Sequence, residues 1–183
     1  MLSGKALRLL LPGIALLLLS GCQSGQGTQP KENNSQAIIF GSCGFTVADS
    51  PATAPPEVYR LMTHCIQSGD LNSAAYLFAL AGSRTTYDAR RTGTQYALSM
   101  HNKILKDTLK QLDGAQKNKF WQLVQQNMAD SSKKNYLCGR LKALEQPSYA
   151  PNYMRVDPAL PLPIKESDRA DWQKAVSQYN QCS

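Results

Sequence analysis

The residues of this sequence that can do chemistry are its five cysteines and two histidines. Together, these residue types form zinc sites and nucleophile–base pairs. No two cysteines form a C-x-x-C pattern, and the histidine nearest a cysteine, His64, is the immediate neighbour of Cys65. Adjacent residues of a helix point about 100° apart, so this pair cannot act together. His101 falls on the apolar side of a predicted helix, where a buried, hydrogen-bonded histidine is commoner than a catalytic base.

Motifs of the common enzyme classes are absent from the sequence. It contains no G-x-S-x-G elbow, Walker A loop, H-E-x-x-H or G-x-G-x-x-G motif. We therefore expect a protein that is not an enzyme and that holds no metal and no cofactor.

The N-terminal segment predicts export from the cytoplasm. Lys5 and Arg8 precede an apolar run over residues 9–19. That run is shorter than the roughly 20 apolar residues that span a bilayer, and Pro12 interrupts it. Residues 1–21 are therefore predicted to be a signal peptide.

The segment ends in Leu19-Ser20-Gly21-Cys22, which resembles the lipobox of bacterial lipoproteins. The resemblance implies that cleavage leaves Cys22 at the new N-terminus, with a diacylglycerol on its thiol and a third acyl chain on its amine. Several acyl chains make a durable membrane anchor where one is marginal. Gln23 is not the aspartate that resembles an inner-membrane retention signal. The resemblance therefore implies the outer membrane, with the protein on its periplasmic face.

Four cysteines remain once Cys22 is acylated, and an even number in an oxidising compartment predicts two disulfides. Four cysteines allow three pairings, and the sequence does not choose among them. We favour Cys43–Cys65 and Cys138–Cys182. The first would fasten an extended leader to the first helix, and the second would fasten the C-terminal helix.

Composition and charge divide the exported chain into a tether and a domain. Residues 22–36 are polar, with no apolar side chain to bury after Cys22, and predict a flexible tether. Residues 37–183 predict one helical periplasmic domain. The whole chain has 20 Lys and Arg against 13 Asp and Glu. An exported protein meets little nucleic acid, so we expect membrane lipid or a protein partner instead.

Apolar residues recur with helical spacing in about six segments, which are 57–68, 71–81, 94–112, 115–129, 136–144 and 168–182. Gly82 is expected to end the second helix, with a polar loop or ragged helix over 83–93. Residues 37–40 predict a short strand or an extended segment. The fold class is therefore mainly α: a small, disulfide-stapled helical bundle with a long Pro-rich loop over 147–163.

Two parts of the chain look specialised for binding: residues 76–82 followed by residues 87–90, and residues 147–154 together with Trp172 and Cys182. Tyr, Trp, Met and Arg are enriched at protein interfaces. The candidate partner-binding residues are Tyr149, Tyr153, Met154, Arg155 and Trp172. The alternative is that Tyr149, Tyr153 and Met154 cap the core beneath the loop. In these short motifs the chain resembles periplasmic lipoproteins found beside secreted antibacterial effectors, including phospholipase immunity proteins of type VI secretion.

The resemblance implies an envelope-anchored immunity or inhibitor protein that occludes a secreted toxin. The alternative is a pilotin-like or scaffolding lipoprotein of an envelope assembly. A third hypothesis, an envelope hydrolase, needs a cleft with converging acid, base or thiol groups.

Overall fold

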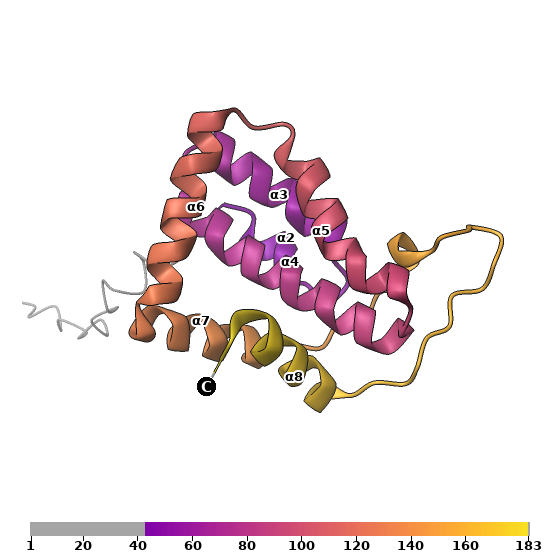
Figure 1. Ribbon diagram of the computed structural model, residues 1–183. Helices are drawn as coiled ribbons and strands as arrows, with labels where there is room; N and C mark the ends of the chain where they lie inside the picture. Colours follow the sequence, from indigo (N-terminus) through magenta and orange to yellow (C-terminus); the bar gives the residue numbers. More distant parts are fainter. Residues whose placement is uncertain (1–42, 183) are drawn as a thin grey trace, which may run out of the picture. The chain divides into compact units, whose positions relative to one another are not determined.

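The computed structural model describes residues 43–182, which are mainly α-helical (Figure 1). The helices are α2 (Phe45–Ala48), α3 (Pro55–Gln67), α4 (Leu71–Thr92), α5 (Gln95–Leu109), α6 (Gly114–Ala129), α7 (Ser131–Ala143), the 3-10 helix η1 (Asn152–Met154) and α8 (Arg169–Asn180). No strand occurs in this part of the chain. The predicted signal peptide, the acylation site Cys22, the tether and the 37–40 segment lie outside the described residues.

The fold confirms the predicted class, a small helical bundle with two disulfides and a long irregular stretch before its last helix. Among residues 43–182, no helix is both long enough and apolar enough to cross a membrane.

Side-chain caps fix where most of the helices begin. The residue before α4, α5, α6, α7 and α8 accepts a hydrogen bond from a backbone N–H of the first turn, and these residues are Asp70, Thr94, Asp113, Asp130 and Asp168. Such a bond satisfies a donor that has no partner inside the helix. Asp and Thr are residue types that favour this capping position.

Three features of the helix pattern differ from the sequence-based expectation. The helix expected to end at Gly82 continues without a break to Thr92, so residues 83–92 are neither a loop nor ragged. Helix α7 begins at Ser131 rather than near Tyr136, because Asp130 caps it. The one-turn helix α2 was not predicted at all, since four residues are too few to show a periodicity.

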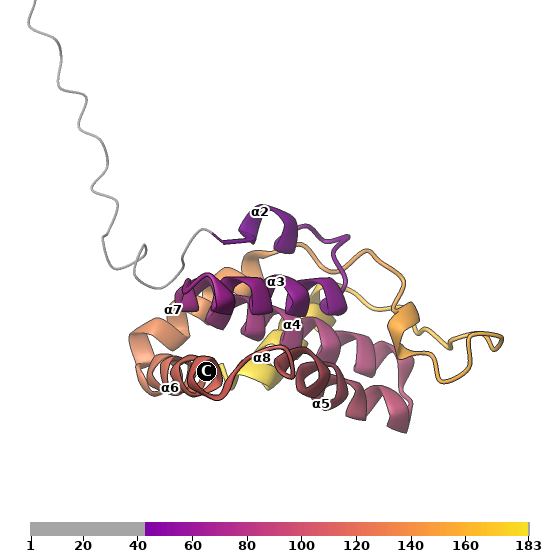
Figure 2. The ribbon, with the colours of Figure 1, turned by 90° about the horizontal axis from the view of Figure 1, so that it is seen from above.

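Helix α4 forms the centre of the domain and contacts α2, α3, α5, α6 and α8 (Figure 1). Viewed from above, α3 lies on one side of it and α5, α6 and α8 lie on the other (Figure 2). Its middle is buried all round, as the apolar run over 74–81 predicts. A residue on α4 therefore contacts a different helix according to the face it occupies.

Gly82 lies within α4 because α8 packs directly on it. A Cβ atom placed on Gly82 would lie 1.9 Å from Cζ of Tyr179. The glycine therefore makes room for the Tyr179 ring of α8 and does not end α4. Only a residue without a side chain leaves room for the tyrosine ring.

Replacing Gly82 by Ala is expected to lower the stability of the domain by about 1–3 kcal/mol, the usual cost of overpacking a core. The displaced Tyr179 ring also moves away from its hydrogen-bond partner, His101. Thermal unfolding measures the effect. Gly139 is the matched control: it lies in α7 with nothing within 4 Å of an added Cβ. There, alanine should stabilise by about 0.5–1 kcal/mol, as in an open helix. An equal gain in Gly82→Ala would contradict the close packing.

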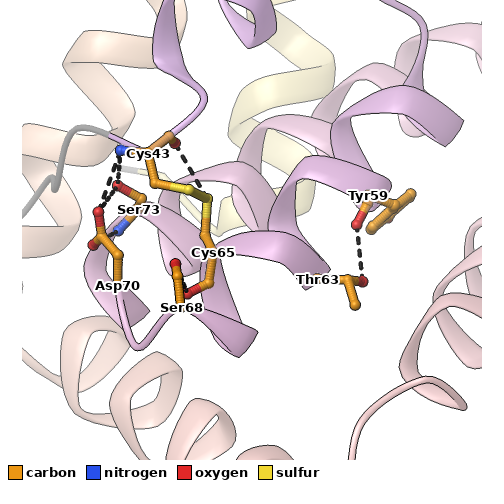
Figure 3. Close-up of a disulfide and its surroundings, with 7 residues drawn as sticks. All are labelled: Cys43, Tyr59, Thr63, Cys65, Ser68, Asp70 and Ser73. Atoms are coloured by element: carbon orange, nitrogen blue, oxygen red, sulfur yellow. Dashed lines mark hydrogen bonds between the residues drawn. A yellow bond between two sulfur atoms is a disulfide. The ribbon is translucent and has the colours of Figure 1, made fainter.

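The two disulfides join Cys43 to Cys65 and Cys138 to Cys182, which confirms the pairing favoured from the sequence. The first fastens the start of the described chain to α3, and the backbone N–H of Cys43 also donates to the side chains of Asp70 and Ser73 (Figure 3). The second joins α7 to Cys182, two residues after the end of α8. Both disulfides and the apolar core of the described chain lie within residues 43–182.

Candidate functional site

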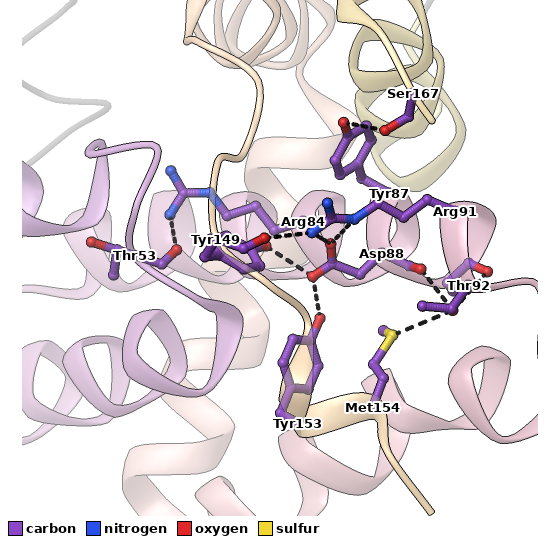
Figure 4. Close-up of polar contacts among 11 residues, drawn as sticks. Thr53, Arg84, Tyr87, Asp88, Arg91, Thr92, Tyr149, Tyr153, Met154 and Ser167 are labelled. Carbon is purple, nitrogen blue, oxygen red and sulfur yellow. Dashed lines mark hydrogen bonds and ion pairs between the residues drawn. The ribbon is translucent and has the colours of Figure 1, made fainter. Parts of the chain in front are cut away.

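The C-terminal half of α4 carries polar side chains along one buried face. Arg84, Tyr87, Asp88 and Arg91 follow the i, i+3, i+4, i+7 spacing that places residues on one side of a helix. The first three side chains are buried, and Arg91 is partly exposed. Figure 4 shows Tyr87, Asp88 and Arg91 pointing toward segments that follow α7 or precede α8, whereas Arg84 points toward Thr53. This face therefore organises chain that lies far away in the sequence.

Asp88 holds the chain that enters the Pro-rich loop. Its Oδ2 accepts hydrogen bonds from the hydroxyls of Tyr149, at 2.9 Å, and Tyr153, at 2.6 Å (Figure 4). Its Oδ1 accepts one from Nε of Arg91 at 2.9 Å, and Arg91 also donates to the backbone oxygen of Tyr149. Asp88 is fully buried, so these donors replace the water that a carboxylate needs.

The electrostatics of this cluster keep the tyrosines protonated. Burial, together with the carboxylate of Asp88, raises the pKa of both Tyr149 and Tyr153 well above the usual tyrosine value. Burial also raises the pKa of Asp88, although its hydrogen bonds and the charge of Arg91 act in the opposite direction. Both hydroxyls therefore remain donors, and Asp88 remains their acceptor.

The same face of α4 holds the chain where it leaves the loop. The backbone N–H of Lys165 donates to the backbone oxygen of Arg91 at 2.8 Å. The hydroxyl of Tyr87 lies 2.7 Å from that of Ser167 (Figure 4). We call Tyr87, Asp88 and Arg91 the α4 clamp, because within little more than one helical turn they fix both ends of residues 155–164. We call those residues the arm.

The arm extends outward from the helices in both ribbon views (Figures 1 and 2). It carries large apolar side chains into solvent: Val156 is 74% exposed, Leu160 61% and Ile164 47%. At its tip, the Asp157 side chain accepts from the N–H of Ala159, and its backbone oxygen accepts from the N–H of Leu160. Apolar side chains gathered on one projecting segment are typical of an interaction site.

Arg84 joins the clamp to the start of the domain. Its guanidinium is buried and donates to three backbone oxygens, those of Ala48 and Thr53 at 2.7 Å and that of Ser50 at 2.9 Å. It thereby fixes the turn between α2 and α3. The N–H of Ser148 donates to the backbone oxygen of Pro51 in this turn, so the chain approaching the arm also rests on it.

The structure places most of the predicted partner-binding residues inside the protein. Trp172 is 0% exposed and Met154 1% exposed, so as partner-contacting residues these two predictions are wrong. Their side chains fill the core against Tyr87 and beside Thr92, respectively. Tyr149 and Tyr153 are partly buried, with their hydroxyls turned inward to Asp88, as the core-capping alternative expects.

Arg155 is the fifth predicted residue and begins the arm. Its side chain is partly buried, and Nη1 donates to the backbone oxygen of Pro158. The side chains that the loop does present to solvent, Val156, Leu160 and Ile164, were not predicted from the sequence. The signal available for them was a set of apolar residues among prolines, with neither helical nor strand periodicity.

Cys65 and His101, which the sequence offered as candidates for catalysis, make structural contacts. Cys65 is in a disulfide, and His64 is exposed on α3. His101 lies between two tyrosines, with Nδ1 2.5 Å from the Tyr59 hydroxyl and Nε2 3.2 Å from the Tyr179 hydroxyl. A neutral imidazole accepts from one hydroxyl and donates to the other. His101 thereby links α3, α5 and α8.

Stability is expected to fall as the pH drops below about 7, because His101 titrates. Burial lowers the pKa of His101 in the folded state, whereas in the unfolded chain it stays near 6.5. The unfolded state therefore binds more protons between these two values. The contribution of His101 to stability is complete above about 6.5 and is lost as the pH falls through the lowered pKa.

Thermal unfolding between pH 7.5 and 5.5 checks this prediction. His101→Gln should flatten the pH dependence that the wild type shows over this range. Identical curves for the wild type and His101→Gln would contradict it.

Among residues 43–182, no group of three or more His, Cys, Asp or Glu side chains is arranged to hold a metal ion. No family model matches the chain, and the comparisons with curated proteins and with solved structures found no match.

Proposed function

We propose that this protein is a membrane-anchored binding protein that docks a partner protein on its arm. The observation that carries the proposal is the arm itself, which exposes Val156, Leu160 and Ile164 and is fixed at both ends by the α4 clamp. An exposed apolar segment is unfavourable in water unless a partner covers it. A segment already held in place loses little conformational freedom on binding, which favours affinity.

The partner best suited to this arrangement is a secreted antibacterial effector, and the protein acts as its immunity or inhibitor protein. An inhibitor of this kind needs a surface that occludes its target and needs no chemistry of its own. The lipobox ending at Cys22 supports acylation there and attachment to the outer membrane, on its periplasmic face. The tether then leaves the domain free to reach a toxin that enters the periplasm.

A protection assay tests the proposed function. The product of the neighbouring gene is expressed in the periplasm of a test strain, with and without this protein. We expect growth arrest without the protein, survival with it, and a complex of the two on co-purification. Unrelieved toxicity, together with the absence of a complex, would reject the immunity function. Co-purification with components of a secretion or pilus machine would instead support the scaffolding alternative.

A further inference from the structure

A second site lies away from the arm, between α4, α6, α7 and α8. These four helices line a cavity of about 230 Å³ that is open to solvent on one side. Most of the cavity wall is apolar, and its principal apolar side chains are Ala75, Phe78, Ala79, Val124, Met128 and Leu137. We call this cavity the apolar pocket. It shares no lining residue with the α4 clamp or the arm.

One residue that lines the apolar pocket, Lys133, carries a positive charge. The Nζ of Lys133 donates to Oδ1 of Asn127 at 3.4 Å, and both residues line the cavity. Within residues 43–182, no carboxylate lies within ion-pair distance of this amine. The side chain is partly buried, so water only partly satisfies its charge.

The surrounding charges do not neutralise Lys133. From residue 114 to residue 143, Asp130 is the one acidic residue, and its side chain caps α7 by accepting from the N–H groups of Ser132 and Lys133. On the α4 side, the hydroxyl of Tyr76 bonds to Asp49, but Asp49 is itself paired with Arg140. The pocket therefore joins an apolar chamber to a positive charge that has no partner of opposite sign among the described residues.

We propose that the apolar pocket binds a single-chain fatty acid, with the alkyl chain inside the chamber and the carboxylate on Lys133. A buried cavity of about 150 Å³ holds a benzene molecule, so the volume here suits an alkyl chain of medium length. An ammonium–carboxylate contact supplies the orientation, since such charge-assisted bonds are the stronger ones. This site does not depend on the proposed partner of the arm.

Calorimetric titration with a homologous series of fatty acids, from hexanoate to dodecanoate, tests the proposal. The protein is used from residue 23 onward, exported with a cleavable leader, so that no detergent or acyl anchor competes for the site. Affinity is expected to rise about fourfold with each added methylene until the chain outgrows the chamber. The absence of binding by every acid at millimolar concentration would overturn the proposal.

Three variants separate the pocket from nonspecific binding. Lys133→Met should weaken decanoate binding about tenfold and leave decanol binding unchanged. Lys134→Met, the neighbouring lysine that does not line the pocket, should bind decanoate like the wild type. Ala75→Leu fills the chamber and should abolish binding of both ligands, with thermal unfolding used to verify that it folds. Decanoate binding that is undiminished in both Lys133→Met and Ala75→Leu would overturn the proposal. That outcome would instead favour an apolar side chain of a protein partner as the occupant of the pocket.

Discussion

Replacing Asp88 by Ala is expected to destabilise the domain by about 3–5 kcal/mol, because it removes one partner from a buried charged cluster. Arg91 then keeps a mostly buried charge without its carboxylate, and the hydroxyls of Tyr149 and Tyr153 lose their acceptor. For a domain of this size the change corresponds to roughly 10 °C or more in melting temperature. Thermal unfolding measures it directly.

The same variant should also release the arm. Trypsin cleaves after Arg155 and Lys165, the two basic residues that flank the exposed apolar segment. We expect faster cleavage at these positions in Asp88→Ala than in the wild type at temperatures where both are folded. Asp88→Asn, which retains one acceptor oxygen, should fall between the two. Asp107→Ala is the control, because Asp107 forms only exposed ion pairs with Lys103 and Lys110 and its loss should change neither readout. Unchanged melting and cleavage in Asp88→Ala would contradict the clamp.

Replacing Arg84 by Met is expected to cost about 3 kcal/mol or more, although the alkyl stem is conserved. The guanidinium donates to three backbone oxygens of the turn between α2 and α3, and a hydrogen bond from a charged group contributes about 1.5–3 kcal/mol. Methionine offers no donor, so the buried oxygen of Ala48 is left without its partner. The loss is partly offset because a charge is no longer buried, which keeps the net effect below the sum of three bonds.

Hydrogen exchange over residues 48–53 localises the effect of Arg84→Met, and thermal unfolding gives its size. Arg84→Lys should recover only part of the stability, because one ammonium cannot reproduce the planar fork of guanidinium donors. The control is Arg90→Met on the same helix, where the side chain is exposed and bonds to Gln178. A wild-type melting temperature for Arg84→Met would show that the turn does not depend on this residue.

The apolar pattern of the sequence predicts much of this fold, because local rules govern those parts. Asp70 and Asp168 cap helices as their residue type favours, and residues 74–81 are buried, apart from the partly buried Phe78, as their uniform apolarity predicts. Gly82 shows the limit of such rules. Glycine usually ends a helix, but here a ring from α8 lies against it, and no local pattern reveals a neighbour almost a hundred residues away.

The site was predicted only in part, for a related reason. Residues 87–90 and 147–154 were both singled out from the sequence, and the structure joins them through Asp88. Their aromatic residues suggested a partner-binding surface. The hydroxyls of Tyr149 and Tyr153 instead point into the protein, because they donate to the buried carboxylate of Asp88. Arg84 was not predicted, because it lies in the polar segment 83–93, which was expected to be a loop or ragged helix after Gly82. The exposed residues of the arm were not predicted because their presentation depends on two distant anchor points.

The affinity of the arm for its partner is the most direct test of the arm as a docking surface. The variant Val156→Asp, Leu160→Asp, Ile164→Asp changes only exposed side chains of the arm and should melt like the wild type. Val47→Asp, on α2 and 52% exposed, is the matched control outside the arm. Titration against the purified product of the neighbouring gene should show at least a 100-fold loss of affinity in the triple variant and none in the control, as expected when the central contacts of an interface are removed. Equal affinity of the triple variant and the wild type would contradict the account.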